Sequence, residues 1–111
     1  MNATVISRLE DIKAKFAELN EEIAKPEVIQ DASLYRSLTK HHADLRQVVE
    51  TYQGLQEVDR EIAGAKDLLN ESDPEMQAMA EKELAILEEQ KEGLEGQLMS
   101  CLLYTSDAAD E

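Results

Sequence analysis

The sequence predicts an all-α protein in which two long helices form an antiparallel hairpin and a third, N-terminal helix packs against it. The 111 residues include only four Gly and two Pro, lack Trp and are 32% charged. Such a composition, rich in Glu, Ala, Leu and Lys, is typical of helical proteins. Apolar residues also recur at steps of three and four in three segments, which is the spacing of one helix face. At this length we expect one domain with an aliphatic core.

The first predicted helix runs from Thr4 to Lys25. Asn2 or Thr4 can cap it, and Pro26 ends it because proline has no amide hydrogen and clashes with the preceding turn. A loop is expected from Pro26 to Asp31. The apolar stripe of this helix contains six residues: Val5, Leu9, Ile12, Phe16, Leu19 and Ile23.

The second predicted helix spans Ala32 to Leu69, with Asp31 or Ser33 as its cap. At roughly 1.5 Å per residue it would be about 55 Å long, and a helix of that length normally leans on another. Its stripe slips by one residue between Leu55 and Ile62. The stripe consists of Leu34, Leu38, His41, Leu45, Val48, Tyr52, Leu55, Val58, Ile62, Ala65 and Leu69.

The third predicted helix runs from Pro74 to about Met99. Ser72 or Asp73 can cap it, Pro74 fits its first turn, and Glu75 stands three residues after Ser72, as in a capping box. The connection of residues 70–73 is short, which favours antiparallel neighbours. The apolar face, interrupted by Lys91, contains Met76, Ala80, Leu84, Leu87, Leu94 and Leu98.

Three groups of residues between 35 and 98 also carry a family resemblance. They are Tyr35-Arg36-Ser37-Leu38, then Asp73-Pro74-Glu75-Met76 with Met79-Ala80 and Glu83-Leu84, and finally Leu94, Glu95 and Leu98. This segment resembles the N-terminal domain of bacterial peptide chain release factors, most closely the class that reads UAA and UAG. The resemblance predicts a role in translation termination, with residues 1–100 forming the helical N-terminal domain of a truncated factor.

The resemblance also implies partners. Release factors act on the cytoplasmic ribosome, where this domain lies toward the stalk base and the recycling GTPase. They read the codon through a tripeptide and trigger peptidyl-tRNA hydrolysis through a Gly-Gly-Gln motif, and neither has a counterpart in this sequence. The resemblance therefore names no catalytic residue, and we expect the chain alone not to be an enzyme.

The tail from Cys101 to Glu111 departs from the family pattern, in which a leucine run, a proline and an acidic segment follow. Its codons can be written to match a transposase adapter used in sequencing libraries. We therefore interpret residues 101–111 as adapter read-through and exclude them from fold reasoning. Removing the three acidic residues of this tail changes the net charge from −14 to −11. An acidic domain is repelled by RNA phosphates, so little direct nucleic-acid contact is expected.

The sequence contains no Gly-rich phosphate loop, no Cys-x-x-Cys motif and no His-Glu-x-x-His motif. No spacing in it supports a Ser-His-Asp arrangement. We predict no catalytic, cofactor-binding or metal-binding residue. Cys101 is the single cysteine, so no disulfide forms within the chain. His41 and His42 point about 100° apart on a helix and cannot easily share an ion. We expect His41 to be partly buried in packing and His42 to be solvated.

Other conspicuous residues have simple structural interpretations. We expect the glutamates to lie on solvated faces, forming local ion pairs with Lys82 and Lys91. Met76 and Met79 are expected to fill gaps where helices meet. Gly54, Gly64, Gly93 and Gly96 are expected to weaken their helices mildly. The acidic clusters are Glu21-Glu22, Glu81-Glu83 and Glu88-Glu89.

Two alternatives remain open at this stage. One is a structural coiled-coil or prefoldin-like helical hairpin, although the stripes are single and slip near Leu55. The other is the sister release-factor class that reads UAA and UGA, or an organellar or rescue relative. No apolar run approaches the roughly 20 residues that span a bilayer, and the N-terminus lacks the pattern of a secretory signal. A cytoplasmic protein without membrane contact is expected.

Overall fold

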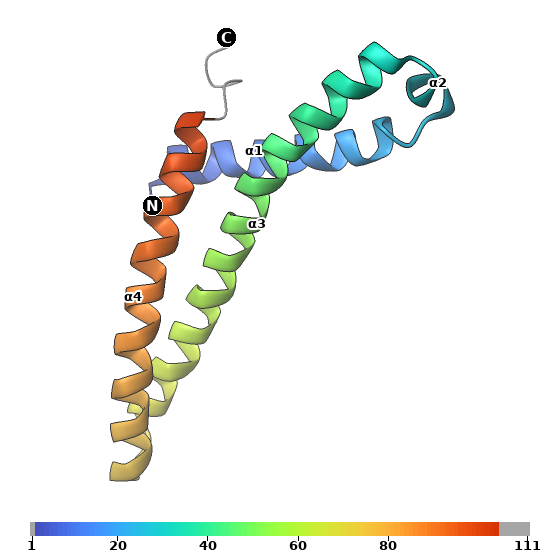
Figure 1. Cartoon of the computed structure of the whole chain (residues 1–111). Helices are drawn as coiled ribbons and strands as arrows, with labels where there is room; N and C mark the ends of the chain where they lie inside the picture. The colour runs from blue at the N-terminus through green and yellow to red at the C-terminus, as the bar shows by residue number, and fades with distance from the viewer. Residues whose placement is uncertain (1, 105–111) are drawn as a thin grey trace. The chain divides into compact units, whose positions relative to one another are not determined.

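The computed structural model describes residues 2–104, in which the regular elements are four helices: α1 (Ala3–Glu22), α2 (Pro26–Ile29), α3 (Ala32–Leu69) and α4 (Pro74–Tyr104) (Figure 1). The all-α prediction is confirmed, and the predicted bounds of α3 are those observed. The short helix α2 replaces the loop expected between the first two helices. α1 is shorter than predicted at its C-terminal end, and α4 is longer.

The segment around Pro26 explains why α1 ends early and why α2 forms. Lys25 is extended, with φ −75° and ψ 136°, as expected for a residue that precedes proline. The helix therefore ends at Glu22 rather than at Lys25, and Ile23 caps it. Pro26 then occupies the first position of α2, where no amide hydrogen is needed. Proline here begins a helix as well as ending one.

Side-chain caps fix the starts of α1 and α3. The Asn2 Oδ1 atom accepts a hydrogen bond of 2.9 Å from the Val5 amide. The Asp31 Oδ1 atom accepts one of 3.1 Å from the Leu34 amide. In each case the first of the two predicted candidates is the cap. Each bond satisfies one of the amides that a helix N-terminus leaves without a partner.

The cap of α4 is Asp73, the second of the two predicted candidates. The Asp73 Oδ1 atom accepts a hydrogen bond of 3.0 Å from the Glu75 amide. Because Pro74 is the first helical residue, Asp73 takes the capping position, and the capping box predicted between Ser72 and Glu75 is wrong. Asp73, rather than Ser72, therefore determines where the hinge ends.

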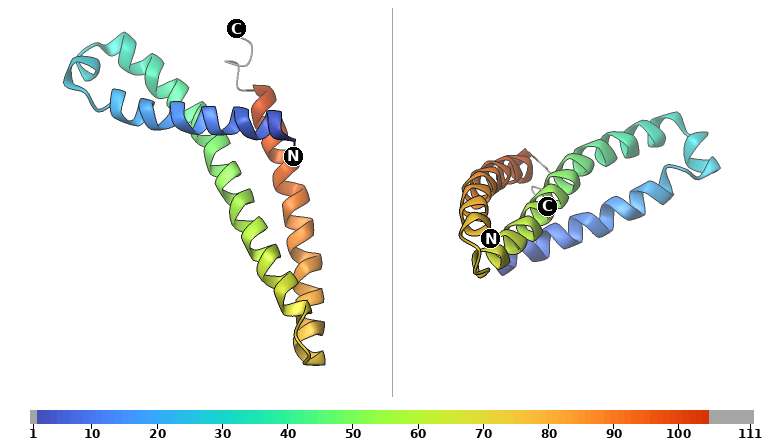
Figure 2. Two further views of the ribbon diagram at one scale, coloured as in Figure 1. Left: turned by 180° about the vertical axis from the view of Figure 1, so that it is seen from behind. Right: turned by 90° about the horizontal axis from the view of Figure 1, so that it is seen from below.

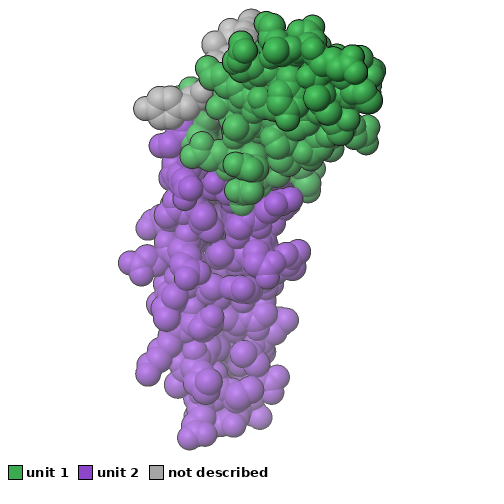
Figure 3. Space-filling view, turned by 45° about the vertical axis from the view of Figure 1, so that its right-hand side comes forward, with its two compact units in different colours: residues 1–50, 101–111 green, residues 51–100 purple. Residues whose placement is uncertain are grey.

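The chain divides into two compact units (Figure 3). Unit 1 contains residues 1–50 and 101–111, and unit 2 contains residues 51–100. Helices α3 and α4 contribute to both units. Each unit has its own set of buried aliphatic side chains.

In unit 1, α1 packs against the first half of α3. The predicted stripe of α1 supplies the buried side chains, with Leu9 only 1% exposed. The predicted stripe of α3 is wrong at its start, because Leu34 is 42% exposed. The buried apolar residues of this unit are Leu9, Ile12, Leu19, Val28, Leu45, Val48, Val49, Cys101 and Leu102.

Unit 2 is an antiparallel helical hairpin in which the second half of α3 runs beside α4, as the views of Figure 2 show. The contacts between the two helices include an ion pair between Asp59 and Lys91, and Leu94 lies opposite Gly54. The predicted hairpin is thus confirmed. Its core cluster contains Val58, Ile62, Ala65 and Leu87, with Leu84 and Leu94 packed against it.

The four glycines lie within helices, as predicted. A β-carbon built on Gly54 would lie 4.0 Å from the nearest atoms of Leu94, an ordinary contact. One built on Gly64, Gly93 or Gly96 would have no neighbour within 4 Å. Close helix approach therefore does not require a glycine at these positions, and the interpretation as mildly weakened helix holds.

Helix α4 continues five residues past the predicted end at Met99. Cys101 and Leu102 are buried, at 9% and 4% exposure, in unit 1. Apolar side chains at these two positions allow the helical pattern to continue, because they extend the buried face of the helix by another turn. The remainder of the predicted adapter tail, residues 105–111, lies outside the described residues.

Candidate functional site

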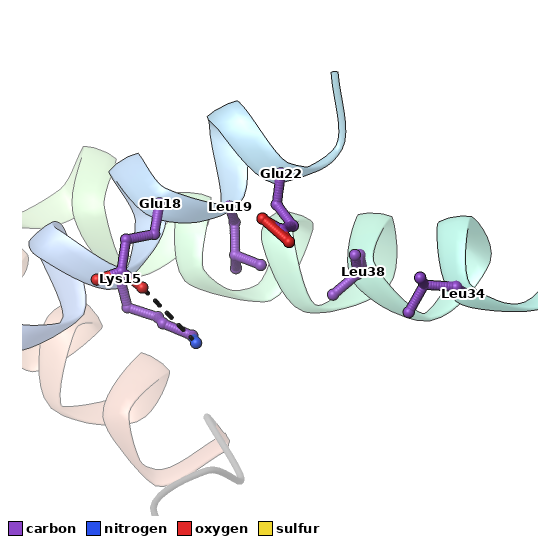
Figure 4. A pocket seen from close by; sticks show the side chains of 6 residues that line it. All are labelled: Lys15, Glu18, Leu19, Glu22, Leu34 and Leu38. Atoms are coloured by element: carbon purple, nitrogen blue, oxygen red, sulfur yellow. Dashed lines mark ion pairs between the residues drawn. The ribbon is translucent and has the colours of Figure 1, made fainter. Parts of the chain in front are cut away.

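A shallow groove of about 310 Å³ lies between α1 and α3 in unit 1 (Figure 4). Its apolar lining comes from both helices. Leu19 of α1 is buried at 3% exposure, whereas Leu34 of α3 remains 42% exposed. The six lining residues are Lys15, Glu18, Leu19, Glu22, Leu34 and Leu38. An apolar floor beside charged side chains is suited to binding the side chains of another protein.

The charged residues of this groove all lie on α1. The Lys15 Nζ atom lies 4.0 Å from Glu18 Oε1, and the Lys25 Nζ atom lies 3.3 Å from Glu22 Oε1. These side chains are between 46% and 73% exposed, so water and salt screen both pairs. They remain free to exchange partners when another charged group arrives.

His42 makes two contacts with α1 in unit 1. Its ring stacks on Phe16 with centroids 4.6 Å apart, and its Nε2 atom lies 2.6 Å from Asn20 Oδ1. The prediction of a solvated His42 is therefore wrong. His41 and His42 are both half-buried, and His42 joins α3 to α1 through these two contacts. We assign His42 a packing role rather than a catalytic one.

In unit 2, Lys91 is the charged residue that interrupts the predicted apolar face of α4. Its Nζ atom lies 3.0 Å from Asp59 Oδ1 on α3, and the two side chains are 38% and 50% exposed. The hydrogen bond to Asp59 raises the pKa of Lys91 above its usual value, against a smaller opposing effect of burial. Lys91 was predicted to pair with glutamates on its own helix, and that prediction is wrong.

The remaining surface predictions have mixed outcomes. Of the clustered glutamates, Glu22 is half-buried and the others are exposed. The solvated-face interpretation therefore holds for the exposed ones. Met79, however, is 67% exposed and Met76 is 37% exposed. The prediction that these methionines fill gaps between helices is wrong for Met79.

The described residues contain no cluster of side chains placed to hold a metal ion. Within residues 2–104, no three His, Cys, Asp or Glu side chains are placed to hold a metal ion. Cys101 is buried and is not part of a disulfide. No helix in the described part is both long and apolar enough to cross a membrane. What these surfaces offer is binding, through a groove in unit 1 and exposed helix faces in unit 2.

Sequence reasoning missed the groove and the partner of Lys91. The groove depends on Leu34 leaving the predicted stripe, which periodicity does not reveal. Lys91 offered a signal, because a lysine on an apolar face needs an anion across the helix interface. Asp59 is on the opposing helix of a hairpin whose turn was already placed at residues 70–73.

The fold and the charge define a small, acidic, helical domain. Residues 12–111 match the model of the PCRF domain family, so the chain belongs to that family.

Three of the relatives that match the chain share a name. The peptide chain release factor 1 of Oleidesulfovibrio alaskensis is 37% identical over 107 residues, which cover 96% of this chain and 30% of the relative. That of Acidobacterium capsulatum is 41% identical, with the same coverage. That of Leuconostoc citreum is 38% identical, covering 96% of this chain and 29% of the relative. No solved structure matches the chain. The chain thus spans about 30% of the length of these relatives.

Proposed function

We propose that the chain is the N-terminal helical domain of a class I peptide chain release factor that reads UAA and UAG, and that it serves translation termination. The observation that carries this proposal is the match of 96% of the chain to proteins named peptide chain release factor 1. The family match over residues 12–111 supports it and favours it over a structural coiled coil or a prefoldin-like hairpin.

In this proposal the domain is a docking arm and not a catalyst. It contacts the cytoplasmic ribosome near the stalk base and the recycling GTPase, while codon reading and peptide release belong to domains that this sequence does not contain. The net charge of −11 without residues 101–111 supports contact with proteins rather than RNA, because phosphates repel an acidic surface. The groove of unit 1, with exposed Leu34, offers one such protein-binding surface.

We also propose that the native domain occupies residues 1–100 and that residues 101–111 come from a sequencing adapter. The support is the match of the whole tail to the translated adapter. The tail nonetheless contributes two buried residues, Cys101 and Leu102, to unit 1. A long sequencing read across codon 100 tests both this boundary and the codon-reading class, because the downstream tripeptide differs between classes.

A domain exchange tests the function. Residues 1–100 replace the matching N-terminal segment of the Acidobacterium capsulatum factor, and peptide release is measured on ribosomes that carry UAA in the A site. We expect half-maximal release at a factor concentration within about threefold of the parent, since binding energy from remote contacts positions the reacting groups. A deletion of the segment and an unrelated acidic helical hairpin serve as controls. A graft that performs no better than these controls contradicts the proposal.

A further inference from the structure

An exposed strip of apolar and small residues follows one face of α4 in unit 2. Met79 and Ile86 are 67% and 53% exposed, and a β-carbon on Gly93 would have no neighbour within 4 Å. The three residues are spaced by seven, which returns to within about 20° of the same direction on a helix with 3.6 residues per turn. We call Met79, Ile86 and Gly93 the α4 strip. It extends about 21 Å along the helix at roughly 1.5 Å per residue.

The α4 strip is distinct from the core of unit 2. The core face of α4 contains Ala80 and Leu87, which are 1% and 2% exposed. Each follows a strip residue by one position, so the core face is turned by about 100° from the strip. The strip is therefore left uncovered within unit 2. Single exposed apolar residues are ordinary on a protein surface, but here two large ones and a bare stretch of helix share one line.

The charges beside the strip are mostly negative. Glu75, Glu83 and Glu89 lie on this side of the helix with one lysine, Lys82. Within residues 2–104, none of these three carboxylates has an ion-pair partner within 4.0 Å. Residues 51–100 together contain thirteen acidic and four basic side chains, a net charge of −9. An apolar line flanked by unpaired carboxylates is complementary to a helix with an apolar face and basic flanks.

We propose that the α4 strip binds an amphipathic helix rich in Lys and Arg from a partner protein. Met79 adapts its shape to the partner, Ile86 supplies a fixed apolar contact, and Gly93 lets the partner backbone come close. The glutamates pair with the basic flanks and orient the incoming helix. The same negative charge opposes RNA and opposes a second copy of this chain across the strip.

The proposal goes beyond the release-factor role, and it is tested on the 111-residue chain without ribosomes. The probe is a labelled 21-residue helical peptide with leucines at heptad spacing and lysines and arginines on both flanks. Binding is followed by fluorescence anisotropy, and the contact site by amide chemical shifts. We expect the largest shift changes at residues 79–93. The double variant Met79→Ser/Ile86→Ser is expected to weaken binding by tenfold or more.

Met99→Ser is the matched control. Met99 is 46% exposed on the same helix but is turned by about 200° from Met79, so this variant is expected to bind within about twofold of the parent. Gly93→Gln separates binding from stability, because it raises helix propensity while placing a side chain where the partner backbone would lie. We expect this variant to melt at a higher temperature and yet to bind the peptide at least fivefold more weakly.

Three results would overturn the proposal. One is equal binding by the parent chain and the Met79→Ser/Ile86→Ser variant. Another is equal binding of a peptide whose flanks carry glutamates instead of lysines and arginines. The third is a dimer of the free chain in sedimentation that Ile86→Ser abolishes, since the strip would then bind a second copy. Loss of affinity as salt increases, together with the variant pattern above, supports the proposal.

Discussion

The two units differ in surface charge although they share the same kind of core. In unit 1, residues 1–50 contain nine acidic and seven basic side chains, a net charge of −2, and residues 101–111 add three acidic ones. Unit 2, residues 51–100, contains thirteen acidic and four basic side chains, a net charge of −9. Both bury mainly aliphatic side chains. Since α3 is one continuous helix that serves both units, a single element supports a nearly neutral surface in one half and an acidic one in the other.

The units also differ in how polar groups join their helices. Unit 1 uses the stack of His42 on Phe16 and the contact of His42 with Asn20. Unit 2 uses the exposed pair of Asp59 and Lys91. Neither kind of contact replaces aliphatic burial as the main source of stability, because each contributes on the order of 1 kcal/mol or less. The two units thus have the same source of stability, aliphatic burial, and differ in the surfaces that they offer to a partner.

The largest expected effect on stability comes from truncating a buried leucine in the core of either unit. Leu9→Ala in unit 1 and Leu87→Ala in unit 2 are each expected to lower the free energy of unfolding by about 3 kcal/mol, since both leucines are at most 2% exposed. Urea denaturation measures the change, and hydrogen exchange shows which amides lose protection. Leu103→Ala, at 84% exposure, is the control and should have little effect. A core variant that matches this control would break the claim that both units depend on aliphatic burial.

A smaller effect is expected at the hinge of unit 2. Asp73→Ala removes the side-chain oxygen that accepts the Glu75 amide and should cost about 1 kcal/mol. Ser72→Ala, one residue earlier, should change the stability little. Thermal unfolding followed by circular dichroism compares the two variants. A larger loss of stability for Ser72→Ala than for Asp73→Ala would show that the helix begins at the capping box predicted from the sequence and not at Asp73.

The smallest effect is expected for the ion pair of unit 2. Asp59→Asn should cost a few tenths of a kcal/mol at neutral pH, because both partners are more than a third exposed and screened by water. The pKa of Lys91 is raised in the folded state, so the pair contributes fully below the usual lysine pKa of about 10.4. Its contribution is lost as the pH rises through the raised value.

The difference in the free energy of unfolding between the parent chain and Asp59→Asn should therefore become smaller at high pH. Urea denaturation at pH 8 and pH 11 measures the difference. Glu61→Gln, an exposed residue of the same helix, serves as the control. A stability gap for Asp59→Asn that is the same at both pH values would show that Asp59 acts through something other than the charge of Lys91.

Much of the fold could be predicted because the relevant signals are local. The spacing of Leu9, Ile12 and Leu19 identifies the buried face of α1, and Pro74 after Asp73 marks the start of α4. The short turn between α3 and α4 forces the chain back on itself, which makes the hairpin predictable.

The rest could not be predicted, because it depends on which side chains meet across helices. Periodicity placed Leu34 in the core and Met79 between helices, yet both are exposed. The stack of His42 on Phe16 and the pairing of Lys91 with Asp59 depend on how two helices are aligned along each other. The sequence of a single helix does not determine that alignment. For the same reason the groove and the α4 strip became visible only with the structure.

The closed turn at residues 70–73 has a consequence for how the molecule forms. The Asn70 amide donates to the Asp67 carbonyl, and the Gln77 side chain donates to the Glu71 carbonyl. These bonds join residues a few positions apart, whereas the ion pair of Asp59 with Lys91 closes a much longer loop. Short loops close at a lower entropic cost. We therefore expect the helix contacts of unit 2, purple in Figure 3, to form first beside this turn and then progressively farther from it, so that the unit folds quickly.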